Sequence, residues 1–471
     1  MSAYDMIING KKVSGNEYFD VINPATEEVL ASCPKANVEQ LNSAVEAAQQ
    51  AFTSWSQTDS ATRAAKIHQI AALIEENTES LAKLLTEETG KAMQGMGSFF
   101  ETGGSVAWTH ATAEMDLPVE VIEEDDAHRI ELHRKPLGVV GSIVPWNFPL
   151  MIAIWHIIPA LKAGNTVVIK PSPLAPLSAI KLVELMNEVL PAGVVNIVTG
   201  GDDIGQAITQ HPDISKVIFT GSTNTGKNIM ASCASTLKRL TLELGGNDAA
   251  IVLPDVDPSA IAETIFHSAF VNSGQTCAAL KRLYVHEGVY DQVCDALVNI
   301  ANQCKVGNGL EQDVLFGPVQ NKQQYERICQ LAKDTKAEGG RFLTGGEPMQ
   351  GPGYFFPITL VADISDGSRL VDEEPFGPML PIIKFSDANE VIARANKNSC
   401  GLGGSVWSGD TELATKLAGQ LECGTAWVNT HAQIQPNVPF GGVKDSGFGV
   451  EFSTQGLEEY TSIQVVHINK G

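Results

Sequence analysis

A regular alternation of apolar runs with helical patterns, which begins at residue 139, constrains the fold more than any other feature of this sequence. The apolar runs are continuous, so they indicate a parallel sheet that helices cover on both faces. The expected strands are 139–144, 167–170, 195–198, 216–220 and 249–252. The expected helices between them are 150–163, 175–189, 204–210 and 225–234. Such sheets bind ligands at the carboxyl ends of their strands, so we look for a site there first.

Two further regions surround this sheet. Helical spacing predicts helices at 38–55, from Ser60 onwards with the serine as a cap, and at 78–89, where Gly90 ends the last one. After Cys277, a looser α/β rhythm predicts a second domain. Its expected strands are 283–285, 342–344, 359–361, 380–383, 405–407 and 426–428, and its expected helices are 290–304, 325–336 and 411–418.

A charged segment at 117–137 differs from its surroundings. Its alternating pattern predicts two strands around a turn at Asp125 and Asp126, with no obvious core to join. It is either a solvated arm or an arm that pairs with another subunit. Long unpaired strand edges invite pairing, which favours the second interpretation. Another strand is expected near the end of the chain, from residue 460 to 468.

Charge and cysteine usage exclude several classes of function. The net charge of −23 disfavours binding to nucleic acid or to anionic membrane surfaces. The eight cysteines are scattered without a CxxC pair, so neither a disulfide framework nor a zinc site is expected, and a reducing cytosol is favoured. The first residues do not resemble a signal peptide, and no run reaches the ~18 apolar residues of a membrane span.

Candidate ligand-binding residues follow several expected strands. Gly221 and Gly226 frame a turn from a strand into a helix, where main-chain N–H groups can bind phosphate, although an ordinary turn explains them equally well. Lys170 ends another strand and could bind a ribose hydroxyl or a phosphate, or simply reach solvent. Asn147 lies in a stiff turn between two prolines, where its amide could donate to an oxyanion or only stabilise the turn.

Cys277 is the candidate nucleophile. It follows Gln275 and Thr276 in a short polar turn between a helical run and an expected strand. Taken alone, such a cysteine is more often a small buried hydrophobe, and it needs help to ionise because a free thiol has a pKa of about 8.5. Glu243, among apolar residues before two glycines, could be a general base or a satisfied buried carboxylate. No histidine forms a local motif with a serine or cysteine, so the base for Cys277 would be a carboxylate, or a cofactor's positive charge would lower its pKa.

These motifs in this order resemble the aldehyde dehydrogenase superfamily over nearly the whole chain. Each motif is weak alone, and their common order and spacing leave little room for chance. The motifs are PWNFP at 145–149, VIKPS at 168–172, FTGS at 219–222, ELGG at 243–246, GQTC at 274–277, EPFGP at 374–378 and PFGG at 439–442.

The resemblance implies oxidation of an aldehyde to the carboxylic acid with NAD, or with NADP. Cys277 would attack the carbonyl carbon to form a thiohemiacetal, with Asn147 and the Cys277 main-chain N–H holding the oxyanion. Loss of hydride to the nicotinamide would leave a thioester. Glu243 would activate the water that releases the acid, and Glu451 matches a family glutamate proposed as a proton relay.

The resemblance also implies where the cofactor and the substrate bind. Lys170 and Glu374 would bind ribose hydroxyls, and Phe376 would pack near the nicotinamide. The expected cofactor residues are Val144, Pro145, Trp146, Lys170, Ser172, Pro173, Gly221, Ser222, Gly226, Leu244, Glu374 and Phe376. The expected substrate residues are Phe148, Met151, Trp155, Val271, Thr276 and His431. This mostly apolar set favours a broad range of aliphatic or aromatic aldehydes.

The fold implied is α/β, with a Rossmann-like cofactor domain, a second α/β catalytic domain and a small β oligomerisation arm. The expected cofactor domain comprises residues 1–117 and 137–244, the catalytic domain 245–450, and the arm 118–136 and 451–471. The arm implies a homodimer or homotetramer, and we expect a cytoplasmic enzyme without a metal.

One departure from the family concerns the cofactor, and two alternatives concern the activity. Many NAD-preferring members have a glutamate where this chain has Pro173, so we expect NADP to be tolerated beside NAD. One alternative is a CoA-acylating enzyme, which the presence of Glu243 disfavours. The other is a non-catalytic protein on the same fold, which Cys277, Glu243 and Asn147 disfavour.

Overall fold

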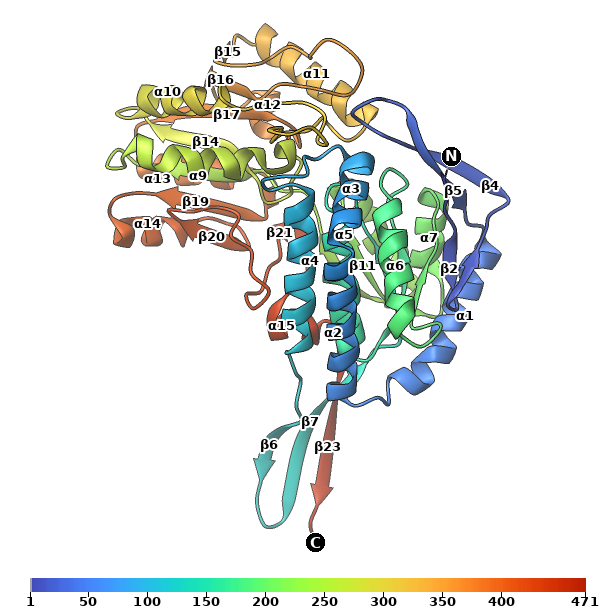
Figure 1. Cartoon of the computed structure of the whole chain (residues 1–471). Helices are drawn as coiled ribbons and strands as arrows, with labels where there is room; N and C mark the ends of the chain where they lie inside the picture. The colour runs from blue at the N-terminus through green and yellow to red at the C-terminus, as the bar shows by residue number, and fades with distance from the viewer. Residues whose placement is uncertain (1) are drawn as a thin grey trace.

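The computed structural model describes residues 2–471, and its strands form two large sheets, a protruding arm and two small sheets (Figure 1). The first large sheet has the order β22-β12-β11-β8-β9-β10-β2-β3. Its parallel strands are β8 (Val139–Ile143), β9 (Thr166–Lys170), β10 (Val195–Ile197), β11 (Ile214–Thr220) and β12 (Arg239–Glu243). Its antiparallel strands are β2 (Met6–Ile8), β3 (Lys11–Val13) and β22 (Gly447–Phe448).

The strand order of the first sheet reverses at β8, which is where a crevice is expected in such a sheet. From β8 the chain adds β9 and β10 on one side, and then returns to add β11 and β12 on the other. In open α/β sheets, ligands bind outside the carboxyl ends of the strands at such a switch point. The connecting helices are α5 (Pro149–Lys162), α6 (Leu177–Val189), α7 (Asp202–Gln210) and α8 (Thr223–Cys233).

One strand of the first sheet was assigned wrongly from the sequence. Residues 249–252 belong to β13 (Asp248–Val252), which pairs with β14 and β19 of the second sheet. The fifth parallel strand of the first sheet is instead β12, which we did not predict. Arg239 at its start is exposed, so the strand reads as polar and only its second half has the continuous apolar character of its neighbours.

The helices before the first sheet agree with their sequence patterns. They are α1 (Val38–Trp55), α2 (Ser60–Glu76), α3 (Thr78–Thr89) and α4 (Ser98–Ala113). The cap of α2 is Asp59 rather than Ser60, because the Asp59 carboxylate accepts from the Thr62 N–H. Gly90 ends α3 with a φ of 79°, a left-handed conformation that glycine adopts without cost. Helix α4 packs against α2 and α5.

The second large sheet has the order β15-β16-β17-β14-β13-β19-β20. Besides β13, its strands are β14 (Leu280–His286), β15 (Arg341–Phe342), β16 (Thr359–Ile364), β17 (Met379–Phe385), β19 (Gly403–Trp407) and β20 (Thr425–Val428). Its helices are α9 (Pro258–Phe270), α10 (Tyr290–Ala301), α11 (Lys322–Ala337), α12 (Arg369–Asp372), α13 (Ala388–Asn396) and α14 (Thr411–Ala418). The last parallel strand of the first sheet ends at Glu243 and the second sheet begins at Asp248, on either side of the predicted domain boundary at 244/245, although β22 of the first sheet comes from residues 447–448.

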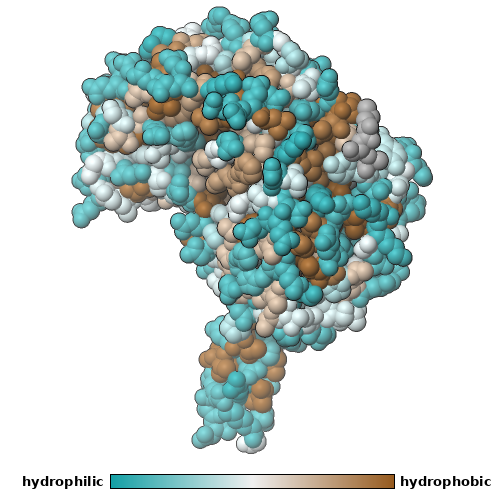
Figure 2. Space-filling model, in the orientation of Figure 1, coloured by the Kyte–Doolittle hydropathy of each residue, from teal (hydrophilic) through white to brown (hydrophobic). Residues whose placement is uncertain are grey.

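The arm projects from the body as a three-stranded antiparallel sheet (Figure 1). It comprises β6 (Glu120–Glu124), β7 (His128–Pro136) and β23 (Thr461–Asn469), with β7 in the centre. The predicted hairpin and terminal strand are confirmed, and the partner of β7 is the end of the same chain. Exposed apolar side chains lie on the arm, where Figure 2 shows brown patches: Val121, Ile122, Ile463, Val465 and Ile468.

The remaining elements are short. A small sheet contains β1 (Ser2–Ala3), β4 (Glu17–Ile22) and β5 (Val29–Lys35), and β18 (Cys400–Gly401) pairs with β21 (Val443–Lys444). Helix α15 (Ser453–Glu458) precedes β23. Over residues 2–471, no helix combines the length and the apolar character needed to cross a membrane.

Candidate active site

A cavity of about 210 Å³ opens at the predicted crevice, beside the carboxyl ends of β8 and β11. It brings together residues from five of the seven sequence motifs, including Asn147, Cys277 and Glu374. Its walls are formed by Pro145, Trp146, Asn147, Thr220, Gly221, Ser222, Leu244, Gly245, Cys277, Gln324, Arg327, Glu374 and Phe376. Most of the expected cofactor residues and two of the expected catalytic residues therefore share one cavity.

Close approach of the main chain explains the glycines around this cavity. Ser222 caps α8, with its hydroxyl oxygen accepting from the Thr225 N–H, so the amino end of α8 faces the cavity. A Cβ on Gly226 would lie 2.5 Å from Leu244, and a Cβ on Gly245 would collide with the Glu374 carboxylate. A helix amino terminus with nearby main-chain N–H groups is suited to a phosphate.

The other expected cofactor residues do not line this cavity. Val144, Gly226 and Ser172 are buried, and Pro173 is half-buried. Lys170, at the end of β9, is 5% exposed, and burial lowers the pKa of its ammonium to about 8. Two carboxylates oppose that shift, because Asp202 and Asp203 begin α7 beside it. The substitution of Pro173 for a family glutamate therefore does not leave the surroundings of Lys170 without negative charge.

Cys277 follows a strained turn. Asn272, Ser273 and Gly274 have φ values of 51°, 55° and 74°, so three consecutive residues are left-handed. Such conformations cost about 1–3 kcal/mol for each non-glycine residue and persist only where the surroundings enforce them. A Cβ on Gly274 would collide with the Gly377 carbonyl oxygen, which holds the cysteine turn against the loop that carries Phe376.

The Cys277 thiol lies in surroundings that disfavour its ionised form. Burial raises its pKa to about 12, and the positive charge of Lys281 acts in the opposite direction. Glu243, Glu374 and Asp248 raise the pKa further. The thiol therefore stays protonated at neutral pH until a base or a further positive charge acts on it.

Asn147 is 4% exposed and is held at both ends. Its side-chain Nδ2 donates to the main-chain carbonyl oxygen of Gln275 at 2.9 Å. The main-chain carbonyl oxygen of Asn147 accepts from Asn272 Nδ2 at 2.9 Å and from Lys91 Nζ at 2.7 Å. An amide nitrogen carries two hydrogens, so one remains for an oxygen in the cavity.

Glu243 ends β12 with both carboxylate oxygens buried and without a hydrogen-bond partner in the described chain. Burial raises the pKa of this carboxyl well above its usual value, and Glu451 raises it further. Glu451 is also buried, and burial raises its pKa to about 8, with Lys216 acting in the opposite direction. His156 Nε2 lies 3.4 Å from Glu451 Oε1, and burial lowers the pKa of that histidine to about 3.

A second and larger cavity, of about 470 Å³, is lined by Val271 and Asn272 at the start of the 271–277 segment. Its walls are mixed, with apolar side chains and one carboxylate at the rim. They are formed by Gly95, Met96, Ala260, Glu263, Thr264, His267, Ser268, Val271, Asn272, Leu315, Phe316, His431, Ala432 and Gln433. The two ends of the 271–277 segment thus line different cavities, and the smaller cavity contains residues from five of the seven motifs.

Of the expected substrate residues, only Val271 and His431 line the larger cavity. His431 is held inside by hydrogen bonding to Ser405 at 2.9 Å and lies 3.7 Å from Asp248. The Thr276 hydroxyl donates to the Val271 carbonyl oxygen at 3.2 Å. Trp155 borders a separate small space with Trp108 and Phe452. The sequence did not reveal Met96, His267 or Gln433, because they come from segments without a motif.

Other residues near the site were also missed. Lys91 and Glu101 form a fully buried ion pair, and Glu101 Oε1 accepts from the Leu150 and Met151 N–H groups at 2.9 and 3.1 Å. This pair fixes the start of α5 directly after Asn147. Gln324 Nε2 donates to the Phe376 carbonyl oxygen at 3.0 Å. No local pattern predicts these contacts, since each joins distant segments.

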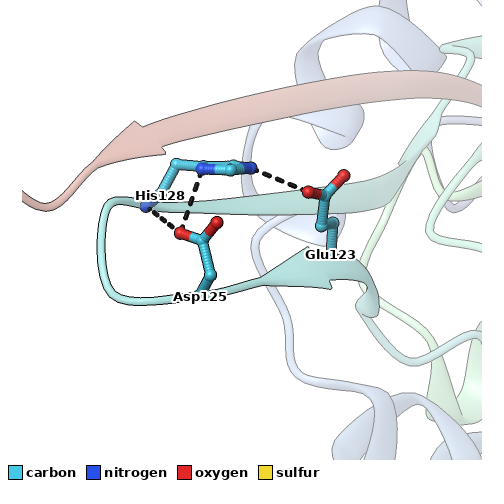
Figure 3. A group of neighbouring side chains, drawn as sticks. All are labelled: Glu123, Asp125 and His128. Atoms are coloured by element: carbon cyan, nitrogen blue, oxygen red, sulfur yellow. Dashed lines mark hydrogen bonds and ion pairs between the residues drawn. The ribbon is translucent and has the colours of Figure 1, made fainter.

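A group of possible metal ligands lies on the arm rather than in either cavity (Figure 3). Glu123, Asp125 and His128 have ligand atoms within 4.8 Å of one another at the hairpin turn. The two His128 ring nitrogens already face carboxylates, at 3.1 Å from Glu123 and 3.0 Å from Asp125. These exposed charges satisfy one another, and we assign them no metal. The absence of a metal requirement stays a prediction.

Known proteins with similar sequences and structures share one family. The model of the aldehyde dehydrogenase family matches residues 11–466. A phenylacetaldehyde dehydrogenase of Pseudomonas fluorescens is 40% identical, over 98% of this chain and 94% of its own length. Retinaldehyde dehydrogenase 3 of Rattus norvegicus is 39% identical, over 96% of this chain and 89% of its own length. The NAD⁺ complex of an aldehyde dehydrogenase from Bacillus cereus superposes with a TM-score of 0.97 at 38% identity, covering 100% of this chain and 97% of that one.

Proposed function

The chain belongs to the aldehyde dehydrogenase family, and from that premise we propose that Cys277 is the nucleophile with which it oxidises aldehydes to carboxylic acids. The observation that carries this proposal is the common cavity of Cys277, Asn147 and Glu374. Cys277 Sγ would bond to the carbonyl carbon, and the resulting oxyanion would accept hydrogen bonds from Asn147 Nδ2 and the Cys277 main-chain N–H. Removing one such donor costs about 2.7–4 kcal/mol of transition-state stabilisation.

We propose that the smaller cavity holds the pyrophosphate and the nicotinamide ribose of NAD, because the amino end of α8 faces it and Glu374 offers a carboxylate to hydroxyl groups. Bound NAD would supply the acceptor for the hydride that leaves the thiohemiacetal carbon. The expected role of Phe376 is supported by its edge-on contact with Trp146, at 5.5 Å between ring centroids, which stiffens this wall. The carboxylate of Glu374 is held in place by Gly246, whose N–H donates to it at 3.2 Å.

Glu243 is proposed as the base that takes a proton from the hydrolytic water. Its two unpartnered buried oxygens support this role, because a buried carboxylate without donors binds a proton readily. Glu451 lies close enough to raise the Glu243 pKa, and we propose that it receives the proton next. The neutral His156 beside Glu451 adds no counter-charge, so Lys216 supplies the positive charge that acts on this carboxyl.

We propose that the substrates are bulky, mostly apolar aldehydes. The 470 Å³ cavity beside Val271 is large enough for an aryl or a medium-length alkyl group, and Glu263 at its rim disfavours anionic aldehydes. Two relatives are named for phenylacetaldehyde and retinaldehyde, which are aldehydes of this kind.

Phenylacetaldehyde is expected to have a kcat/KM about 10–100-fold above that of acetaldehyde, because burial of one large apolar group contributes about 1.5–3 kcal/mol. Succinic semialdehyde should fall below both. Steady-state rates of NADH formation over such a panel test this. In Val271→Phe, which narrows the cavity, the rate should fall for phenylacetaldehyde and not for acetaldehyde. A preference for acetaldehyde in the unmodified enzyme would contradict the proposal.

NADP is expected to support turnover, with a kcat/KM about 10–100-fold below that of NAD. Pro173 offers no charge against a 2′-phosphate, whereas Asp202 and Asp203 lie near Lys170 and disfavour one. Parallel kinetics measure the ratio of kcat/KM with NAD to kcat/KM with NADP. Asp203→Asn should reduce this ratio. A ratio above about 1,000 would show that the missing glutamate has no consequence.

The CoA-acylating alternative predicts that turnover requires CoA. Glu243 supports water as the acyl acceptor, because its buried oxygens have no other partner within residues 2–471. Continuous NADH formation without CoA would support hydrolysis, and a strict requirement for CoA would support the alternative.

A cytoplasmic location is proposed as well, since all eight cysteines are free thiols.

A homodimer or homotetramer is proposed, with the arm as a contact between copies. Ile463 and Val465 are 57% and 51% exposed on β23, and no strand within residues 2–471 pairs with the outer edge of β23. We expect Ile463→Asp with Val465→Asp to lower the molar mass in size-exclusion chromatography with light scattering. Gln464→Asp, on the opposite face of the same strand, is the control. A monomeric unmodified protein would contradict the proposal.

A further inference from the structure

Lys281 is a buried lysine that touches both halves of the smaller cavity. It is the second residue of β14, four residues after Cys277, and its side chain is 2% exposed. Its Nζ contacts the Cys277 carbonyl oxygen and forms an ion pair with Glu374 Oε1 at 2.8 Å. A buried lysine is costly unless it is paired, so these partners define where its charge is used.

The ion pair joins the nucleophile turn to the opposite wall. Glu374 Oε1 also accepts from the Gly246 N–H at 3.2 Å, and Arg327 Nη2 donates to the Glu374 carbonyl oxygen at 2.8 Å. Lys281 Nζ lies 5.8 Å from the centre of the Phe376 ring. One ammonium therefore contacts the Cys277 main chain, the Glu374 carboxylate and the neighbourhood of Phe376.

The charges around Cys277 make this lysine unusual. The charged groups that face the thiol are Lys281 from β14, Glu243 from the end of β12, Asp248 from β13 and Glu374 from the loop after α12. Three are acids and disfavour a thiolate. Lys281 is the one among them that favours it, because an opposite charge nearby stabilises the ionised form.

We propose that Lys281 is a positioning residue for the reaction: its ammonium, held between the Cys277 carbonyl oxygen and Glu374, stabilises the Cys277 thiolate and fixes Glu374 for the cofactor. This inference rests on the proposed function of Cys277 as the nucleophile. The thiol proton leaves to solvent, and the electron pair stays on Sγ beside the retained positive charge.

The test is the pH dependence of Cys277 alkylation in the full-length protein. Iodoacetamide is neutral, and the thiolate displaces its iodide, so the rate follows the ionised fraction of the thiol. Peptide mass spectrometry assigns the alkylated cysteine. In Lys281→Met, the profile should move to higher pH by about one unit, which makes the rate at pH 8 roughly tenfold lower. The KM for NAD should rise several-fold.

Matched variants separate charge from packing. Lys281→Arg keeps the charge and should restore most of the rate. Lys281→Gln keeps polar contacts without charge and should shift the pH profile of alkylation as far as Lys281→Met does. It replaces Lys281→Met in the test if the methionine variant does not fold. Lys384→Met removes an exposed lysine from β17 in the same sheet and should change nothing.

Unchanged profiles in both neutral variants would overturn the inference, as would an arginine variant as slow as the methionine one. The proposed function fails separately, if Cys277→Ala still oxidises aldehydes. An inactive Cys277→Ala together with an unshifted Lys281→Met profile removes only the role of Lys281.

Discussion

Replacing Cys277 by alanine is expected to lower kcat for aldehyde oxidation by about 10⁴-fold or more, because no other group can form the thiohemiacetal and the thioester. Cys277 lines the cavity that contains Asn147 and Glu374, at the end of a turn that three left-handed residues hold in place. Alanine fits the same turn, so the variant should remain folded and should still bind NAD. The rate of NADH formation with saturating phenylacetaldehyde measures the loss.

Cys304→Ala is the matched control, because Cys304 is a half-buried thiol just beyond α10 that lines neither cavity. It should retain the full rate. If Cys277→Ala kept more than about one hundredth of the rate, Cys277 could not be the nucleophile, and the enzyme would transfer hydride without a covalent step.

Glu243→Gln is expected to lower the steady-state kcat by about 10²–10⁴-fold while leaving the first turnover intact. The substitution keeps the shape of a side chain that is 3% exposed and removes only its ability to accept a proton from water. Rapid-mixing experiments should therefore show a burst of about one NADH per active site, followed by slow release of the acid.

The kcat of the unmodified enzyme is expected to depend on pH in the direction that a Glu243 base requires. Burial raises the pKa of Glu243 above its usual value, so the carboxyl is protonated at low pH. The fraction of enzyme in which Glu243 is ionised, and can accept a proton, increases as the pH rises. kcat should therefore increase with pH, and this rise should disappear in Glu243→Gln. Glu451→Gln should reduce kcat less, since Glu451 acts after the water has been activated. A Glu243→Gln enzyme without a burst would mean that Glu243 is needed to form the thioester.

Residues at strand ends were the easiest part of the site to predict. Gly221 and Asn147 follow apolar parallel strands and Lys170 ends one, and the position of such strand ends is set by the sheet rather than by details of packing. The motif around Cys277 was visible for a similar reason, because its glycine is required by a left-handed φ and by contact with Gly377.

Contacts between distant segments were not predictable. Lys281 lies four residues beyond the GQTC motif, and its proposed role depends on Glu374, which is 93 positions later in the chain. The Lys91–Glu101 pair, which supports Asn147, has no sequence signature, because Lys91 lies in the loop before α4 and Glu101 lies within α4. The strand β12 was missed because its first residues are polar, and the cavity beside Val271 includes Met96 and Gln433 from segments with no signature.

The central claim is that Cys277 carries the acyl group during turnover. It is tested most directly by quenching Glu243→Gln with acid after one turnover of phenylacetaldehyde and NAD, and mapping its peptides by mass spectrometry. The account predicts one phenylacetyl group, on the peptide that contains Cys277 and on no other cysteine peptide. Stoichiometric NADH with no acylated cysteine, or with the acyl group on Cys400 or Cys423, would contradict it.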